Sequence, residues 1–394
     1  MAQDWSVHGV VLRVVWPTVE ESASAAVAEA AANLAPRVPT VIKVRHDFGI
    51  WGPSLAVHDD AGLRLDDDEP VWPELALVLG GRAPYWPPGL REASSMLQWR
   101  PGIPPAEVAA AVEIDPAPVL RLAATLPTTD TAHAVLLELV QHVQYRASEY
   151  AEHTIQTVTE DPKVAAWVEL AATSLPVPAP VELDDVVLRD GWLTVAARTD
   201  TLAHQSVVQA LRYGHTAALP YTSAEYIDPT TGLGAEWAAR LEPTSPYAGF
   251  EILYGHLVPG DEDTITDYLT DPATDAPALR LASGKLLAAV PHRLPAVSPL
   301  AELTLGMPIW IRLGDGTVHL APRRDAPGIS WGYQGSGTNT LALLISHLLD
   351  DITAPAATQL HGGGAGLEKL LQTNWPDGTT LTRAELEAAR TGQR

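Results

Sequence analysis

Runs of β-branched residues and one Ala-rich stretch predict an N-terminal unit that mixes strands with a helix. The expected elements are a strand, a helix and two strands, over residues 6–16, 18–35, 40–50 and 53–68. The strands are rich in Val, Ile and Leu, as extended chains are in folded proteins. Thr18 begins the helix, because its hydroxyl can accept hydrogen bonds from the first free backbone amides. The order indicates an α/β unit of the β-α-β-β type over residues 1–100.

Later hydrophobic patterns divide the rest of the chain into three segments. The expected segments are a helical unit, a mixed α+β unit and a C-terminal module, over 101–175, 182–290 and 300–394. Two proline-rich stretches, 174–183 and 290–300, separate them, because proline removes amide donors and stiffens the chain. The C-terminal module begins with a β-hairpin turned at 314–316, and an apolar helix follows. The fold class is therefore α+β, built from several units.

The stretch ISWGYQGSGTNTLALLISHLLDD, residues 329–351, passes from an aromatic strand through three glycines into an apolar helix. Free amides at the start of such a helix can bind an anion, since the helix dipole is positive there. The residues that would form this binding site are Trp331, Tyr333, Gly335, Ser336, Gly337 and Asn339. A dinucleotide-binding fingerprint is incomplete, because Thr340 stands at its third small position and no second strand with an acidic end follows.

The alternative is that this segment serves packing. Gly335 and Gly337 would permit a tight turn, and Thr338 or Asn339 would cap the helix. One stripe of the helix is apolar and would be buried, namely Leu341, Leu344, Ile345 and Leu348. The pattern favours this packing interpretation over an anion site.

The same region, about residues 307–352, resembles a short domain of unknown function found in bacterial and phage proteins. That family pattern reads approximately Trp-Gly-Tyr-Gly-Gly-Ser-Gly-Pro, followed by a leucine-rich helix. The matching residues here are Trp331, Gly332, Tyr333, Gly335, Ser336 and Gly337. Gln334 and Thr338 depart from the pattern, since they stand in place of a glycine and the proline. The resemblance implies a β-hairpin-plus-helix module without an assigned activity, in a mobile-element setting.

A second segment, PPAEVAAAVEIDPAPVLRLAATL at 104–126, resembles the generic helix-turn-helix pattern. The apolar positions that such a motif buries are occupied by Val108, Val112, Ile114, Val119 and Leu122. The segment departs from the pattern because Glu113 replaces the turn glycine and two prolines begin the second helix. Only Arg121 on that helix offers a contact to a base edge or a phosphate, so a helical hairpin packed in a core is the favoured interpretation.

The stretch ELVQHVQYRASEYAEH places Glu138, His142, Glu149 and His153 within an arc of roughly 60° on a helix over 131–159. Carboxylates and imidazoles on one helical face are the ligands that a transition metal needs. Glu138 and Glu149 lie about three turns apart, so each Glu/His pair supplies at most two ligands. An amphipathic helix with this face in water is the favoured interpretation, because the opposite face is apolar.

The composition of the 394 residues, 46% hydrophobic, is that of a globular protein. The formal net charge is −23, from 48 acidic and 25 basic residues, and only four of the basic residues are lysines. This preference for Arg, with abundant Ala, Pro and Gly, is typical of a GC-rich bacterial genome. A negative surface repels polyanions, so we expect no non-specific binding to nucleic acid or to an anionic membrane.

Several classes of chemistry lack their sequence signals. Cysteine is absent, which excludes disulfides, thiolate zinc sites and cysteine nucleophiles. No Gly-x-Ser-x-Gly, Ser-x-x-Lys or His-Glu-x-x-His motif occurs. The chain does not start with a basic stretch and a long apolar run, so a cytoplasmic location is expected. Several of the 12 tryptophans precede proline, and burial in a core is favoured over a recognition surface.

These observations predict a non-catalytic interaction or assembly protein of a mobile element, a phage or a bacterial defence system. Its expected partner is another protein, and no cofactor is expected. Two alternatives stay open. One is a metal-dependent hydrolase that uses the Glu/His pairs of the 131–159 helix. The other is a DNA-binding regulator that acts through residues 104–126.

Overall fold

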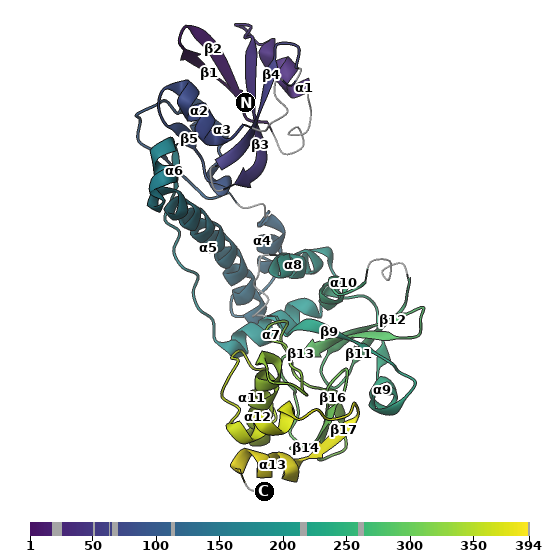
Figure 1. Ribbon diagram of the computed structural model, residues 1–394. Helices are drawn as coiled ribbons and strands as arrows, with labels where there is room; N and C mark the ends of the chain where they lie inside the picture. The colour runs from purple at the N-terminus through teal and green to yellow at the C-terminus, as the bar shows by residue number, and fades with distance from the viewer. Residues whose placement is uncertain are drawn as a thin grey trace. The chain divides into compact units, whose positions relative to one another are not determined.

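The computed structural model describes residues 1–17, 26–49, 52–62, 64, 70–111, 115–212, 219–258 and 264–392 (Figure 1). The chain forms two compact units. Unit 1 comprises Met1–Asp115 and Gln141–Pro180, and unit 2 comprises Pro116–Val140 and Val181–Arg394. The predicted α+β class is confirmed, since helices and several separate sheets alternate along the chain. Within the described ranges, every helix falls short of the length or the apolarity that crossing a bilayer requires.

A four-stranded sheet forms the N-terminal part of unit 1. Its strands, in sheet order, are β1 (Ala2–Val7), β2 (Val10–Val15), β3 (Thr40–Gly49) and β4 (Gly52–Asp59). β2 and β3 are parallel, so the chain must cross over between them, and α1 (Ala26–Ala32) lies in that crossover. The prediction of one strand over 6–16 is wrong, because His8 and Gly9 adopt positive φ angles of 47° and 86° and turn β1 back onto β2. The predicted helix start at Thr18 lies outside the described residues.

Short elements complete unit 1. They are α2 (Trp72–Leu79), β5 (Ala83–Tyr85), η1 (Pro88–Leu90), α3 (Ala93–Gln98), β6 (Ala106–Val108), α6 (Pro162–Trp167), β7 (Val168–Leu170) and β8 (Ala172–Ser174). β5 pairs with β7 and β6 with β8, each in parallel. The helical character predicted for 101–175 is therefore wrong at β6, β7 and β8. It is confirmed for α5 (Thr131–Glu160), whose residues up to Val140 belong to unit 2 and whose remainder belongs to unit 1.

Tryptophans occupy the core of unit 1. Trp16 meets Trp72 and Trp86 edge to face, with ring centroids 5.5 and 5.0 Å apart. Trp99 stacks on Trp5 at 5.0 Å and meets Trp86 at 5.9 Å. Edge-to-face geometry is favourable because it places the positive edge of one ring on the negative face of another. The predicted burial of tryptophan is confirmed for Trp72, Trp86 and Trp99, which are all at most 1% exposed.

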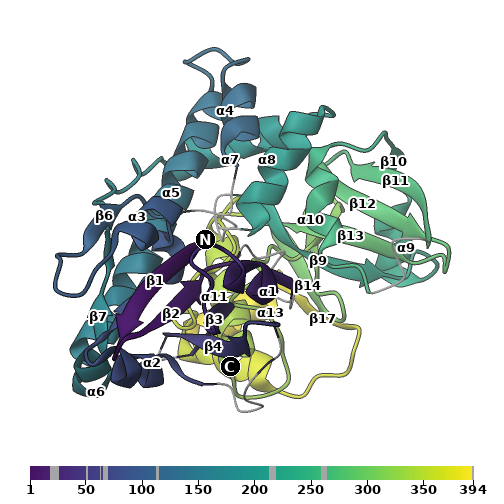
Figure 2. The same ribbon diagram turned by 90° about the horizontal axis from the view of Figure 1, so that it is seen from above.

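Three helices lie side by side in unit 2, as both views show (Figures 1 and 2). They are α4 (Ala117–Ala123), α7 (Asp185–Ala196) and α8 (Thr201–Arg212). α7 packs closely on the start of α5, because a Cβ atom at Gly191 would lie 2.5 Å from the carbonyl oxygen of Thr131. Glycine at this position therefore fixes how near the two helices come.

An antiparallel five-stranded sheet follows these helices. Its order is β10 (Glu242–Pro243), β11 (Ile265–Asp271), β12 (Ala276–Leu281), β13 (Leu286–Pro291) and β9 (Tyr221–Ile227). The shorter helices of this region are α9 (Gly232–Ala238), η3 (Ala248–Phe250) and α10 (Glu251–Tyr254). Arg240 ties this sheet to the next, because it pairs with Asp271 at 2.6 Å and also donates to the carbonyl oxygen of Val318.

The last part of unit 2 is a second antiparallel sheet covered by helices. The strands, in sheet order, are β16 (Val318–Leu320), β15 (Trp310–Leu313), β14 (Leu300–Leu305) and β17 (Thr379–Thr382). The helices are α11 (Ser336–Asp350), α12 (Ala365–Gln372) and α13 (Arg383–Thr391). Side chains of β15 alternate, so Ile311 packs among the leucines of α11 while Trp310 packs among those of the five-stranded sheet.

Three sequence predictions concern this last part. The hairpin turned at 314–316 is confirmed as β15 and β16, with Gly316 at a φ of 90°. The predicted apolar stripe of α11 is confirmed, since Leu341, Leu344, Ile345 and Leu348 are buried. The aromatic strand predicted before the glycines is wrong, because residues 328–335 form no strand. The second proline-rich stretch, 290–300, lies inside unit 2, and several of its residues are buried, among them His292 and Leu294.

Candidate functional site

The segment before α11 is held by hydrogen bonds to α12 and to the chain that follows it. The backbone N–H of Gly332 donates to the carbonyl oxygen of Leu371 at 2.8 Å, and Gly332 has a φ of 87° that disfavours other residues. The indole N–H of Trp331 donates to the carbonyl oxygen of Trp375 at 3.3 Å. Trp331 is thereby half-buried, whereas the next aromatic residue, Tyr333, is 53% exposed.

The start of α11 shows why two of its glycines are required. A Cβ atom at Gly335 would lie 2.4 Å from the ring of Tyr333, and one at Gly337 would lie 2.3 Å from Oγ of Ser330. Ser330 donates its hydroxyl to the Tyr333 hydroxyl at 2.8 Å. The predicted tight turn is wrong as the reason for these glycines, because neither has a positive φ. They instead let two side chains lie against the first turn of the helix.

The predicted caps of this helix are also wrong. α11 begins at Ser336, after Gly335, whose backbone is extended at a φ of −175° and which offers no side-chain cap. Thr338 is buried within the first turn, and Asn339 Nδ2 hydrogen-bonds His361 Nδ1 at 3.2 Å. Of the six candidate binding residues, Trp331, Tyr333 and Gly335 therefore lie in the segment before α11, and Ser336, Gly337 and Asn339 lie at the start of this helix. Whether they bind an anion stays a prediction.

Met307 and Pro308, just before β15, border two hollows of unit 2. A hollow of about 110 Å³ is lined mainly by apolar side chains, among them Ile309, Ile329 and Trp331. A second hollow, of about 420 Å³, also reaches Met307 and Pro308. Met307 itself is 88% exposed. A long apolar side chain thus stands in solvent where two depressions meet.

The charges beside Met307 are predominantly negative. The second hollow is lined by the carboxylates of Asp228, Glu302 and Asp377, against the single guanidinium of Arg312. Arg312 is already engaged, because it binds Glu236 through two nitrogens at 2.7 Å each. Hydrogen bonds from Thr230 hold the pKa of Asp228 below its usual value, so that carboxylate is ionised at neutral pH.

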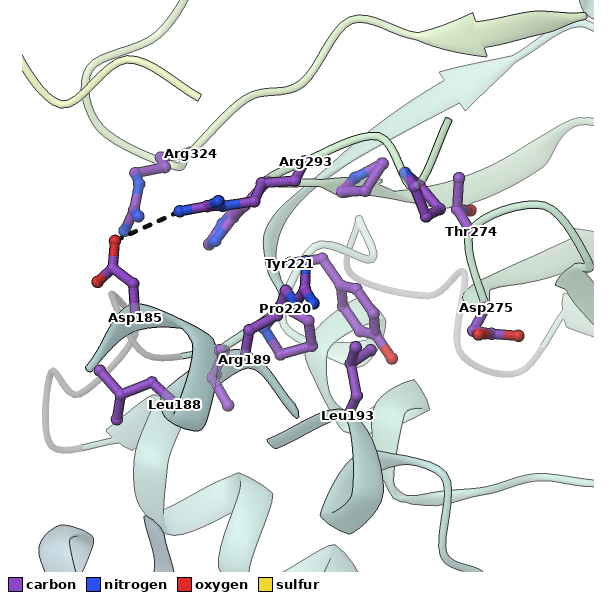
Figure 3. Close-up of a pocket in the computed structure, with 14 residues that line it drawn as sticks. Asp185, Leu188, Arg189, Leu193, Pro220, Tyr221, Thr274, Asp275, Arg293 and Arg324 are labelled. Carbon is purple, nitrogen blue, oxygen red and sulfur yellow. Dashed lines mark hydrogen bonds and ion pairs between the residues drawn. The ribbon is translucent and has the colours of Figure 1, made fainter. Parts of the chain in front are cut away.

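A third cavity, of about 170 Å³, lies beside α7 and brings together three arginines, Arg189, Arg293 and Arg324 (Figure 3). Two carboxylates, Asp185 and Asp275, also line the cavity, at different ends of it. Asp185, in the first turn of α7, lies 3.4 Å from the guanidinium of Arg293, whereas Asp275 lies at the other end of the cavity beside Thr274. The cluster of cations is therefore concentrated around Asp185.

Burial shapes the ionisation of the groups around this cavity. It lowers the pKa of His292 to about 3, with the Arg324 cation adding to the effect, so His292 is neutral at neutral pH. Nε2 of this neutral imidazole shares a hydrogen bond of 2.8 Å with the Thr222 hydroxyl. Burial likewise lowers the pKa of Arg324, the Asp185 carboxylate opposes this effect, and the neighbouring Arg293 cation adds to it. An arginine nevertheless keeps its charge at neutral pH.

Sequence patterns did not identify this cavity. Its arginines lie on α7, after β13 and after β16, at positions 189, 293 and 324, so no local motif contains them. The one local signal is the His292-Arg293 pair, which stands between two prolines of the second proline-rich stretch. That stretch was interpreted as a linker because of its prolines.

The four residues of the Glu/His face differ in their surroundings. Glu149 and His153 are exposed, and Glu149 lies 3.8 Å from Arg146 on the same helix. Glu138 is buried and belongs to unit 2, while His142 belongs to unit 1. The prediction that the whole face lies in water is therefore wrong at Glu138. Among the described residues, no three His, Asp or Glu side chains are grouped so that they could hold a metal ion.

In the segment 104–126, the position of the first helix of a helix-turn-helix is occupied by a strand, β6. This strand ends at Val108 and pairs with β8. Val112 and Ile114 lie outside the described residues. Val119 and Leu122 are buried on α4, and Arg121 is exposed and donates from Nε to the carbonyl oxygen of Ala117 at 3.3 Å.

Comparison of the whole chain with protein-family models, with curated proteins and with solved structures found no match.

Proposed function

We propose that the protein is a non-catalytic interaction protein, and that unit 2 binds a segment of a partner protein at Met307. The observation that supports this proposal is the exposure of Met307 between two hollows, with Pro308 and Trp331 beside it. Methionine is flexible and polarisable, and aromatic residues next to it are typical of the buried centre of protein interfaces. A partner side chain that fills the smaller hollow would bury both Met307 and Trp331.

The charges beside Met307 define the chemistry of the partner segment. Carboxylates surround the larger hollow, and the chain as a whole carries a net charge of −23. A complementary segment therefore carries lysine or arginine next to one large apolar side chain. Electrostatic attraction of this kind raises the association rate and weakens with salt.

Selection of random peptides on the full chain tests this proposal. We expect the selected peptides to combine an apolar residue with at least two basic residues. Met307→Asp should weaken their binding by about 2 kcal/mol, the loss typical of a central interface residue. Val297→Asp is the matched control, since Val297 is fully exposed, belongs to the same unit and lines neither hollow. Binding constants at low and high salt give both readouts.

Peptides that bind the Met307→Asp and Val297→Asp variants equally well would contradict the proposed surface. Peptides without basic residues would contradict the proposed partner chemistry. The mobile-element, phage or defence setting is tested separately, by capturing the partner in the native host with both variants. A protein retained by Val297→Asp and lost from Met307→Asp is the partner that this proposal requires.

The two other functions gain no comparable support. Each Glu/His pair on α5 lacks a third ligand beside it among the described residues. In the segment 104–126, β6 takes the place of the first helix that DNA recognition needs.

A further inference from the structure

The cavity beside α7 differs from the rest of this acidic protein in its charge. Arg189, Arg293 and Arg324 surround a space in which Asp185 is the nearby carboxylate (Figure 3). The lining thus carries three cations against two carboxylates, Asp185 and Asp275, and each guanidinium has five N–H donors. Arg189 is partly engaged by its neighbour Asp190 at 2.9 Å. The cavity is therefore rich in donors for oxygen atoms of an anion.

The other wall of the same cavity is apolar. It is formed by Leu188 and Leu193 of α7, Leu219 and Pro220 before β9, and Pro291 and Pro295. Such a surface favours a hydrocarbon group over water, since burying apolar area is favourable. Polar and apolar residues contribute about equally to the lining, which suits a small molecule that carries both kinds of group.

We propose that this cavity binds a small organic oxyanion, in which a carboxylate or phosphate group is joined to an apolar body. The oxyanion lies against the arginines and the apolar body lies against the leucine and proline wall. Arg293 contributes the forked donor that matches two oxygens of either group. This inference goes beyond the proposed function and does not rest on it, because Met307 does not line this cavity.

Asp185 occupies the position that the ligand takes. Its side chain is 73% exposed and its oxygen lies 3.4 Å from Arg293, which is longer than the 2.7–2.9 Å of a strong charge-assisted bond. The ligand therefore displaces a weak internal partner. Binding also adds negative charge beside Arg324, whose pKa is lowered by burial, raised by the Asp185 carboxylate and lowered by the Arg293 cation.

Calorimetric titration with four probes tests the proposal on the full chain. The probes are phenyl phosphate, benzoate, inorganic phosphate and benzyl alcohol. At least one of the first two should bind about tenfold more tightly than inorganic phosphate, because it also covers the apolar wall. Benzyl alcohol, which has no charge, should not bind. The ranking of phenyl phosphate and benzoate assigns the ligand to phosphates or to carboxylates.

Three variants locate the site. Arg293→Gln and Arg324→Gln should each weaken binding about tenfold, the loss expected for one charge-assisted contact. Arg280→Gln is the matched control, because Arg280 pairs with Asp267 at the same 3.4 Å elsewhere in unit 2 and should leave binding unchanged. Asp185→Asn should strengthen binding about threefold, since it removes the internal competitor. A residue that served only structure would not give opposite effects at Arg293 and Asp185.

Several outcomes would overturn this inference. They are no saturable binding of phenyl phosphate or benzoate, equal binding of inorganic phosphate, and weaker binding after Asp185→Asn. Circular dichroism identifies a variant that fails to fold. If Arg293→Gln or Arg324→Gln fails to fold, the binding measured for the other arginine variant tests the site. Met307→Asp should bind the probes as the wild type does, so failure of the partner proposal and failure of this inference are distinguishable.

Discussion

In unit 1 the buried centre is a set of indole rings, whereas in the C-terminal part of unit 2 it consists of leucines and isoleucines between a sheet and three helices. Indole rings fill a large volume with few residues and have few rotamers. The N–H groups of Trp16, Trp72, Trp86 and Trp99 are buried without a hydrogen-bond acceptor among the described residues. The rings therefore contribute to the core of unit 1 by packing, together with aliphatic side chains such as Leu12, Ile42 and Leu55.

Unit 2 combines its aliphatic core with ion pairs and neutral histidines at the borders of hollows. His292 and Arg293 line the arginine cavity, and Glu225 pairs with Arg323 beside the smaller hollow near Met307. Partly buried charges of this kind cost stability unless they are partnered, and they are frequent at functional sites. Both proposed binding surfaces lie in unit 2, and this difference between the units is the reason for placing them there.

Removal of one indole ring is the most severe test of this comparison. Trp86→Ala should destabilise unit 1 by about 3–5 kcal/mol, because the ring contacts both Trp16 and Trp99 and leaves a cavity. Segment-resolved hydrogen exchange should show faster exchange in β1–β4 and unchanged exchange in β14–β17. Trp167→Ala is the control, since that ring is 39% exposed. Equal acceleration in both units would mean that the two cores are not stabilised separately.

Buried ion pairs also occur in unit 1, and Arg13 provides the clearest test. Its guanidinium binds Asp4 at 2.6 Å and donates to the carbonyl oxygens of Ala31 and Leu34 at 2.7 and 2.9 Å. Arg13→Met should cost about 3 kcal/mol in urea unfolding, because it leaves these acceptors without their donor. Arg37→Met, which removes an exposed ion pair with Asp60, should cost less than about 1 kcal/mol. Similar losses would show that burial does not decide the effect.

Acid should destabilise unit 2 more than unit 1. An unfolded histidine titrates near 6.5, whereas burial lowers the pKa of His292 to about 3 and that of His319 to about 4. Below pH 6.5 the unfolded chain therefore binds more protons, and stability that is full above this pH falls as the pH is lowered. In the described part of unit 1, burial also lowers the pKa of His58.

The two histidines of unit 2 together should cost about 2 kcal/mol between pH 6 and pH 5. Urea unfolding at several pH values measures this dependence. His292→Gln should remove about half of it, and His153→Gln, at an exposed position of α5, should leave it unchanged. An unaltered slope in His292→Gln would contradict the assignment of the effect to the buried imidazole.

The smallest expected effect concerns the start of α11. Gly337→Ala should cost about 1 kcal/mol, because its Cβ displaces the Ser330 hydroxyl and breaks the bond to Tyr333. Gly328→Ala is the control, since a Cβ there meets no atom within 4 Å. Thermal unfolding compares the two variants. If both are neutral, Ser330 simply rotates away and the glycine is not needed for packing.

Elements with a regular period could be predicted from the sequence. The hairpin of β15 and β16 and the buried stripe of α11 follow from periods of 2 and 3.6 residues. β6, β7 and β8 could not be predicted, because three residues are too few to show alternation and only their distant partners fix them. The turn at His8 was missed for another reason, since a non-glycine residue seldom adopts a positive φ.

The candidate sites divide in the same way. Tyr333 and its glycines could be singled out because they are contiguous, although the reason for the glycines is the approach of Ser330 and Tyr333. The arginine cavity assembles side chains from separate elements, and nothing local marks Arg189 or Arg324 as neighbours. Such a site is a property of tertiary packing, which a sequence pattern does not contain.

The path of the chain between the units has a consequence for inheritance. Residues 116–140, with Val119 and Leu136 buried, belong to unit 2 but are encoded between the two parts of unit 1. A gene fragment that ends at residue 180 would therefore encode all of unit 1 together with α4 and the first part of α5, which belong to unit 2. Neither unit is encoded by one uninterrupted stretch, so a recombination event with a single crossover cannot exchange either unit alone.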